Sequence, residues 1–326
     1  MKETGVAFLV TLALLAAPLA ADAQPDRVPR IGWLVFGGPF SETSPGLDAA
    51  ILRGLRELGY VYGKNVALQY RYAEGRAERL PELATELVRL KVDLLLGIGG
   101  DIAVAFQKAT STIPIVVGTS TDPVRARLVP SLARPGGNLT GVTFLSEELA
   151  AKRVELLKEV MPGASRLGVL WDPAHADNDF QEIQGAARRL GLRLLSLEVR
   201  RPGDLDAAVG TAVREHVDAL IVVPGRLMAL LDKRITEAAA SHRLAVISGW
   251  REFASVGALL TYGPNRLEGS KRVAYYVDRV LKGTKPADLP IERPTTFELV
   301  VNTKTAKVLG LTIPPSVLAR ADEVIE

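Results

Sequence analysis

The sequence RIGWL at residues 30–34 returns as RLGVLW at 166–171, and three further stretches return after it in the same order. These pairs are LRELGYVYGKNVALQYR at 55–71 with ARRLGLRLLSLEVR at 187–200, KVDLLLGIG at 91–99 with HVDALIVVPG at 216–225, and STIPIVV at 111–117 with SHRLAVI at 241–247. One such match is weak, because strand–helix–strand units look alike. Four matches in one order indicate two similar lobes.

Short runs of Val, Ile and Leu alternate with amphipathic stretches in both copies, which is typical of parallel sheets covered by helices. In the first copy we expect strands at 31–36, 66–70, 93–98, 113–118 and 139–144. The helix between the first two strands has Leu47, Ile51, Leu55 and Leu58 on one face and is expected to end at Gly59. The predicted fold class is α/β, with two doubly wound parallel-sheet lobes and a cleft between them.

The C-terminal part of the chain begins with a predicted helix over 266–281, followed by Gly283. A proline-rich stretch at 285–294 and a strand at 297–301 come next. A tail of this kind can cross back between lobes. We therefore expect discontinuous domains, with 28–144 and 263–290 in lobe one, and 145–262 and 291–326 in lobe two.

Residues 1–23 have the pattern of a secretory signal peptide. Lys2 precedes an apolar run at 6–20, and Ala21, Asp22 and Ala23 form a small-x-small site that predicts cleavage after Ala23. The run contains Pro18 and is shorter than the roughly 20 residues that span a bilayer. We expect export to the periplasm, although Glu3 is unusual in a segment that is normally positive. The chain has no cysteine, so its stability after export must come from packed cores.

Composition and motifs exclude several classes of function. The net charge of +3 is small and basic residues are interspersed with acidic ones, so we expect no nucleic-acid partner. The three histidines have no metal-ligand spacing, and His216 and His242 are predicted to lie at solvated helix ends. The sequence contains no G-x-S-x-G, Walker A or G-x-G-x-x-G motif. We therefore expect no catalysis, no metal and no cofactor.

Open parallel sheets bind ligands at the carboxyl ends of their strands. The polar and aromatic residues expected at these ends, and therefore in a ligand site, are Phe40, Ser41, Gly100, Asp101, Thr119, Asp122, Asn178, Arg226, Trp250 and Tyr262. Thr119 and its neighbours precede a helix expected near Pro123, so they could bind a carboxylate or simply cap that helix. For Trp250 and Tyr262, ligand contact and core packing remain equally open. Trp171 is predicted to pack within its lobe.

Further stretches carry a family resemblance. They include PRIGWL at 29–34, RGLRELGYVYGKNVALQYRYAEGR at 53–76, LVPSLARPGGNLTGVT at 128–143, YGPN at 262–265 and KGTKPADLPIERPTTFELVVNTKTAKVLGLTIPPSVLARADEVIE at 282–326. Together they resemble the ABC-transporter substrate-binding family that includes tryptophan- and phenylalanine-type receptors. The resemblance implies a type I periplasmic-binding-protein fold, export, and delivery of a small-molecule ligand to a membrane permease driven by a separate ATPase. We expect a monomer.

Two residues depart from the usual pattern of that family. Asp101 stands where an acid is usually absent, and Gly225 is followed by Arg226 where Asp is usual. Because arginine binds carboxylates bidentately, we expect a carboxylate-bearing ligand, either an amino acid or an aromatic or organic acid. Arg226 could bind that carboxylate, or it could pair with Asp101 as a latch between the lobes. A ligand-sensing module that signals to a membrane partner, and less readily an exported α/β enzyme, remain alternatives.

Overall fold

The computed structural model describes residues 27–42, 44, 46–145, 149–175 and 178–326. The predicted signal peptide at 1–23 lies outside these residues. Within them, no helix has the length and apolar character needed to cross a membrane.

The first lobe contains five described strands, all parallel, in the order β2-β1-β3-β4-β5. Their bounds are β1 (Arg30–Val35), β2 (Ala67–Tyr72), β3 (Leu94–Ile98), β4 (Ile115–Thr119) and β5 (Leu139–Thr143). One face of the sheet packs against α1 (Leu47–Glu57) and α10 (Arg266–Leu281), and the other against α2 (Leu80–Arg89) and α3 (Gly100–Ala109). A short helix, η1 (Ala77–Arg79), precedes α2. Strands buried on both faces explain the uninterrupted apolar runs of the sequence.

The second lobe contains seven described strands in the order β12-β11-β10-β9-β8-β6-β7. They are β6 (Arg166–Trp171), β7 (Arg193–Glu198), β8 (Ala219–Val222), β9 (Ala245–Ser248), β10 (Leu260–Pro264), β11 (Phe297–Asn302) and β12 (Glu323–Ile325). One face is covered by α4 (Ala150–Val160), α5 (Asp179–Arg189), α11 (Thr303–Leu309) and α12 (Pro315–Leu318). The other is covered by α6 (Leu205–Arg214), α7 (Arg226–Leu230), α8 (Asp232–Ser241) and α9 (Glu252–Ser255), with η3 (Pro202–Asp204) before α6.

The second sheet is not wholly parallel, because β11 pairs with β10 in the antiparallel direction. The chain enters β11 from the first lobe instead of from a helix on the second sheet. Parallel neighbours need a crossover connection, whereas a strand that returns from the far lobe has no such constraint.

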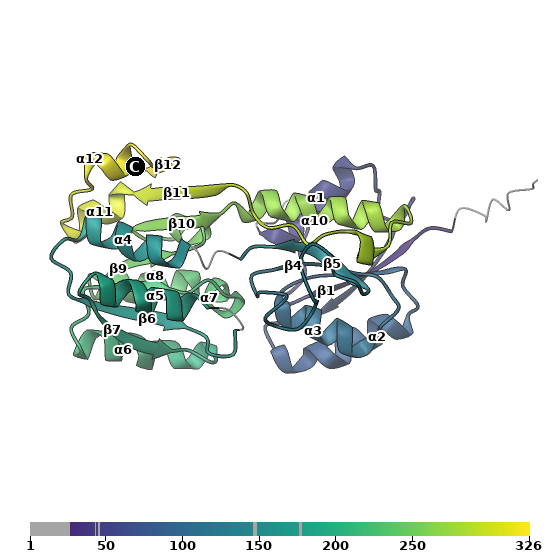
Figure 1. Cartoon of the computed structure of the whole chain (residues 1–326), viewed down its shortest axis with the longest axis horizontal. Helices are drawn as coiled ribbons and strands as arrows, with labels where there is room; N and C mark the ends of the chain where they lie inside the picture. The colour runs from purple at the N-terminus through teal and green to yellow at the C-terminus, as the bar shows by residue number, and fades with distance from the viewer. Residues whose placement is uncertain (1–26, 43, 45, 146–148, 176–177) are drawn as a thin grey trace, which may run out of the picture.

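The chain passes between the lobes after β5, after β10 and before β11, and the last two of these connections lie side by side (Figure 1). α10 follows β10 of the second lobe but packs on α1, β4 and β5 of the first. After η4 (Pro286–Asp288), Ile291 packs in the core of the first lobe and Glu292 bridges to Val142. The chain then returns to the second lobe, where it forms β11. Arg266, the first residue of α10, therefore stands where the two lobes are joined.

The prediction of a helix near Pro123 is wrong. Residues 123–127 form one helical turn that does not continue, in which the Ala126 N–H donates to the Asp122 carbonyl over 2.9 Å. Arg127 then adopts a left-handed conformation with φ 57°, which ends the turn. In contrast, His216 and His242 are exposed at the ends of α6 and α8, as predicted.

Candidate functional site

Arg226 reaches from the second lobe to the first. Its guanidinium pairs with the Asp101 carboxylate, donates to the Ile98 carbonyl over 3.5 Å, and lies 3.7 Å from the centre of the Phe36 ring. Of the two roles that the sequence left open, the structure therefore shows the pair with Asp101. Burial lowers the pKa of the Arg226 guanidinium, and the negative charge of Asp48 opposes this effect. The guanidinium is thus stacked, paired and largely removed from water, in the geometry that suits arginine.

The backbone of the first lobe makes room for this arginine at Gly99. A Cβ atom on Gly99 would lie 2.7 Å from an Arg226 Nη1 atom, and the φ angle of 133° is one that L side chains rarely adopt. The glycine run after β3 therefore allows the guanidinium to approach the main chain. Asp101 follows in the first turn of α3, where a negative charge is favourable.

Two further contacts join the loops of the two lobes. The Ser120 Oγ lies 3.3 Å from the His175 Nε2, and the Arg125 Nη1 donates to the Asn178 Oδ1 over 3.1 Å. Burial lowers the pKa of His175, although Asp172 and Asp179 oppose the shift, so the imidazole is neutral at pH 7. Sequence reasoning placed Asn178 at this boundary but missed His175, which lies in the same loop.

The aromatic residues at the edge of the first lobe form a cluster of four rings. Phe40 packs 5.3 Å from Trp33 and 5.6 Å from Tyr70, and Tyr70 stacks on Tyr72 at 5.8 Å. The Trp33 indole N–H donates to Asp48 Oδ1 over 3.0 Å. Burial raises the pKa of Asp48 to about 6, and the Trp33 hydrogen bond and Arg226 oppose it. Asp48 was not predicted, because an acid in a first helical turn is ordinary in sequence.

We expect Asp48→Asn to stabilise the protein at pH 7 to 8. Above a pH of about 6 the folded protein bears the cost of an ionised, buried carboxylate, whereas below about pH 4 Asp48 is protonated both folded and unfolded. The stabilisation, on the order of 1–3 kcal/mol at pH 7, should therefore shrink as the pH falls through 6 towards 4. Asparagine also keeps an oxygen that accepts the Trp33 hydrogen bond. Urea unfolding at several pH values measures the difference.

Asp218 provides the control with the opposite sign. Burial alone would raise its pKa, but hydrogen bonds from Ser165 and Arg166 lower it below the usual value. Asp218→Asn should therefore lose stability at pH 7 and approach the wild-type protein as the pH falls. If Asp48→Asn and Asp218→Asn showed the same pH slope, the assignment of the raised pKa to Asp48 would be wrong.

Four other predicted residues have local structural contacts. Ser41 is exposed, and its N–H donates to Ser44 Oγ over 2.9 Å. Asp122 Oδ1 accepts the N–H of Val124 over 2.8 Å. Thr119 is buried and accepts the Thr121 N–H over 3.0 Å, while a Cβ on Gly100 would lie 2.2 Å from Thr121 Oγ1. The contacts of Thr119, Asp122 and Gly100 order the loop after β4 and bring it against the start of α3.

The junction of the lobes holds the last two predicted residues and one that was missed. Trp250 is only 2% exposed, and the Arg266 guanidinium lies 3.6 Å from its ring centre. Tyr262 is half-buried against the core of the second lobe, and its carbonyl accepts a hydrogen bond from Arg153 over 3.3 Å. Arg153 also pairs with Asp179 at 2.6 Å, with both side chains buried. Arg266 had no signal in the sequence beyond its place at a strand-to-helix junction.

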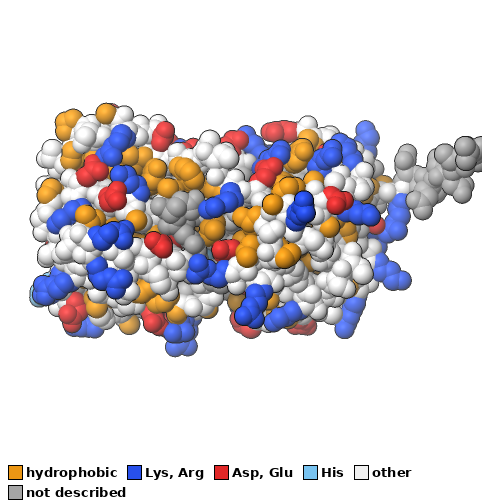
Figure 2. All heavy atoms as spheres, viewed as in Figure 1, with side chains coloured by type: hydrophobic (Ala, Val, Ile, Leu, Met, Phe, Trp, Pro, Cys, Tyr) orange, Lys and Arg blue, Asp and Glu red, His pale blue; other side chains and the backbone are white. Residues whose placement is uncertain are grey.

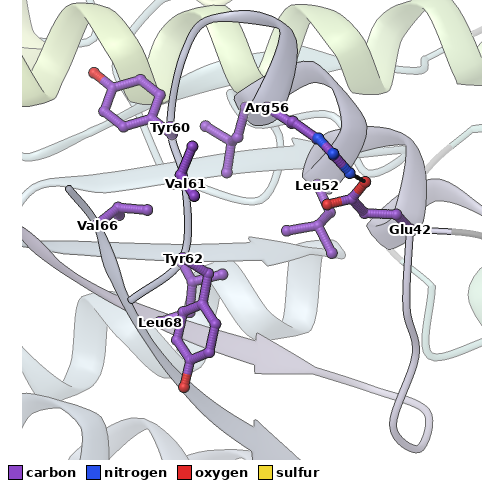
Figure 3. Close-up of a pocket in the computed structure, with 9 residues that line it drawn as sticks. Glu42, Leu52, Arg56, Tyr60, Val61, Tyr62, Val66 and Leu68 are labelled. Carbon is purple, nitrogen blue, oxygen red and sulfur yellow. Dashed lines mark hydrogen bonds and ion pairs between the residues drawn. The ribbon is translucent and has the colours of Figure 1, made fainter. Parts of the chain in front are cut away.

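A separate pocket of about 300 Å³ lies between α1 and the β2 edge of the first lobe (Figure 3). It is lined by Glu42, Leu52, Leu55, Arg56, Tyr60, Val61, Tyr62, Val66 and Leu68, and the Arg56–Glu42 ion pair lies at one end. None of the predicted ligand residues lines it. Among the described residues, no three His, Asp or Glu side chains are grouped closely enough to hold a metal ion.

The fold and the paired loops define a two-lobed binding protein, and comparison with known proteins places it in a family. The model for ABC transporter substrate binding protein matches residues 44–325, so the chain belongs to this family. The resemblance found in the sequence is thus confirmed, as is the type I periplasmic-binding-protein fold. Substrate-binding proteins of ABC transporters are exported.

The chain is similar to a curated protein and to solved structures. The chain is 26% identical over 273 residues to a tyrosine-binding protein of Clostridioides difficile (strain R20291), covering 82% of this chain and 78% of the relative. It is 29% identical to an ABC domain from Streptococcus pneumoniae in complex with L-Trp, with a TM-score of 0.83, covering 92% of this chain and 100% of the other. A conserved domain protein from Vibrio cholerae is also 29% identical, with a TM-score of 0.84, covering 91% of this chain and 100% of the other.

Proposed function

We propose that the protein is an exported receptor that captures a small carboxylate-bearing ligand between its lobes and delivers it to an ABC permease driven by a separate ATPase. The ligand is an amino acid or an aromatic or organic acid. The observation that carries this proposal is the meeting of arginines and aromatic rings where the lobes touch. Arg226 lies on Phe36 and Arg266 on Trp250.

The chemistry of this boundary suits such a ligand. Aromatic side chains bind an apolar or aromatic body, while a few fixed polar groups orient its charged end. The named relatives support the proposal, because one is a tyrosine-binding protein and another was solved with L-Trp. Lysines and arginines are otherwise interspersed with acidic residues on the drawn face of both lobes (Figure 2), so no broad cationic surface competes for the ligand there.

The connections between the lobes support a hinge. A ligand that contacts both lobes stabilises the closed arrangement by its differential affinity for that arrangement. The permease would then recognise the closed form. The predicted signal peptide at 1–23 would direct the receptor to the periplasm.

We expect an aromatic amino acid or aromatic acid to raise the melting temperature of the purified protein without being consumed. A ligand at a hundredfold excess over its Kd adds about 2.7 kcal/mol to the free energy of unfolding. A thermal-shift screen over amino acids, aromatic acids and dicarboxylates would identify it, and chromatography after several hours would test for turnover. Conversion of the ligand would support an enzyme instead, and no response to any of these compounds would reject the proposed ligand class.

A further inference from the structure

Arg153, Arg226 and Arg266 lie near the junction of the lobes, and the first two pair with acids of the protein. Arg153 pairs with Asp179 at 2.6 Å, and Arg226 pairs with Asp101. Arg266 differs from both. Among the described residues, its one acidic contact joins Nη1 to Glu252 Oε1 over 3.3 Å, and the Glu252 side chain is 40% exposed.

The Arg266 guanidinium is nevertheless buried. Its side chain is 10% exposed, and burial lowers its pKa, an effect that the charge of Glu252 opposes. The Nε atom has no hydrogen-bond partner among the described residues. A buried cation with an unused donor is costly, on the order of 1–3 kcal/mol for the lost hydrogen bond. Such a group suits an anion that arrives from outside the chain.

The packing around Arg266 fixes its guanidinium in place. It lies 3.6 Å from the Trp250 ring centre in the second lobe and 5.9 Å from that of Phe144 in the first. Gly263 approaches Gly249 so closely that a Cβ there would lie 1.7 Å from the Gly249 carbonyl oxygen, which holds the start of α10 against Trp250. The guanidinium plane is thus set by contacts from both lobes.

Other buried polar atoms near this junction also have no partner among the described residues. They are the Trp250 Nε1, the Thr261 Oγ1 and the Ser270 Oγ, on side chains that are 2%, 1% and 0% exposed as residues. Thr261 pairs in register with Ser248, two residues before Trp250. Ser270 lies four residues after Arg266 and therefore on the same face of α10. Buried polar groups are normally satisfied, so the unused N–H of the Trp250 ring, against which Arg266 stacks, is a second donor beside the guanidinium that a ligand could use.

We propose that Arg266, stacked on the Trp250 ring, binds the carboxylate of the ligand, and that Glu252 pairs with the guanidinium when no ligand is bound. The inference rests on the proposed function and names the residue that selects its ligand class. Because Arg266 contacts both lobes, its occupation by a carboxylate links ligand capture to their closure. The Arg226–Asp101 pair then joins the strand ends of the two lobes in the closed form and does not contact the carboxylate.

The test compares acids with their uncharged amides by calorimetry at pH 7.5. The probes are L-tryptophan with L-tryptophanamide, phenylacetate with phenylacetamide, and benzoate with benzamide. Wild-type protein should bind at least one acid about tenfold or more tightly than its amide, the difference that about 1.4 kcal/mol produces. Arg266→Ala should raise the Kd of that acid at least tenfold and leave that of the amide within about threefold.

Glu252→Gln supplies a second variant whose expected effect has the opposite sign. Since it removes the acid that competes for Arg266, it should tighten the binding of the acid by about threefold or more. A purely structural role of Arg266 predicts no gain. This variant decides the question even if Arg266→Ala does not fold, as judged by its melting curve without ligand.

Arg272→Ala is the matched control. Arg272 belongs to the same helix, lies 3.7 Å from the Tyr275 ring centre and pairs with Glu292 at 2.6 Å, away from the junction. It should retain the preference for the acid. If Arg266→Ala kept that preference, or Glu252→Gln weakened binding, the role of Arg266 would be refuted while the receptor function stood. If the wild-type protein bound an acid no more tightly than its amide, the role of Arg266 would likewise be refuted, whereas the receptor function would fall only if the whole thermal-shift screen gave no response.

Discussion

Replacing Asp179 by alanine is expected to lower the free energy of unfolding of the second lobe by about 3–5 kcal/mol. The Arg153 side chain is fully buried and that of Asp179 is 4% exposed, with their charged atoms 2.6 Å apart. Removal of the carboxylate takes this ion pair and its hydrogen bond away from a guanidinium that stays buried. Arg153 also donates to the Tyr262 carbonyl. The substitution should therefore also destabilise β10, the strand that leads into α10.

The adjacent helix residues provide the control. Lys152 and Glu155 in α4 pair at 2.8 Å, but their side chains are 40% and 47% exposed. Glu155→Ala should change stability by less than about 1 kcal/mol. Urea unfolding followed by circular dichroism measures both variants. A combined Arg153→Met and Asp179→Leu variant should recover much of the loss, because apolar residues of similar volume often replace a buried pair without cost. Equal effects of Asp179→Ala and Glu155→Ala would contradict this account.

The two-lobed fold could be predicted because its information is local and repeated. Residues 94–97 of β3 and the whole of β8 are buried, so the apolar runs LLLGI and ALIV each indicate a central strand. The antiparallel β11 could not be predicted in the same way. Its direction depends on where the chain returns from the first lobe, and that is a property of the whole molecule.

The candidate site was harder to predict, because its contacts join residues far apart in the chain. Arg226 contacts the Ile98 carbonyl 128 residues away. Its pair with Asp101, at the same strand end, was one of the two roles that the sequence left open. Arg266 and Asp48 were missed, since their environment depends on packing between elements. The loop at Pro123 was misjudged for a local reason, the left-handed Arg127, which no residue-type preference foretells.

The Arg226–Asp101 pair yields the last prediction. We expect Arg226→Ala and Asp101→Asn each to raise the Kd of the ligand about tenfold, and the double variant to bind no more weakly than either single one. The pair contacts both lobes, so its loss lowers the population of the closed form, and the apparent Kd rises as that population falls. Two changes that remove one shared interaction are not additive.

The sign of the Asp101→Asn effect separates the two roles of Arg226. If Arg226 bound the ligand carboxylate directly, removal of its competing acid would tighten binding, as we expect for Glu252→Gln beside Arg266. If the pair is a latch, the same removal must weaken binding, because the closed form loses a contact and the ligand gains none. Calorimetry with the three variants and the best acid from the panel therefore assigns one arginine to closure and the other to the carboxylate, or reverses that assignment.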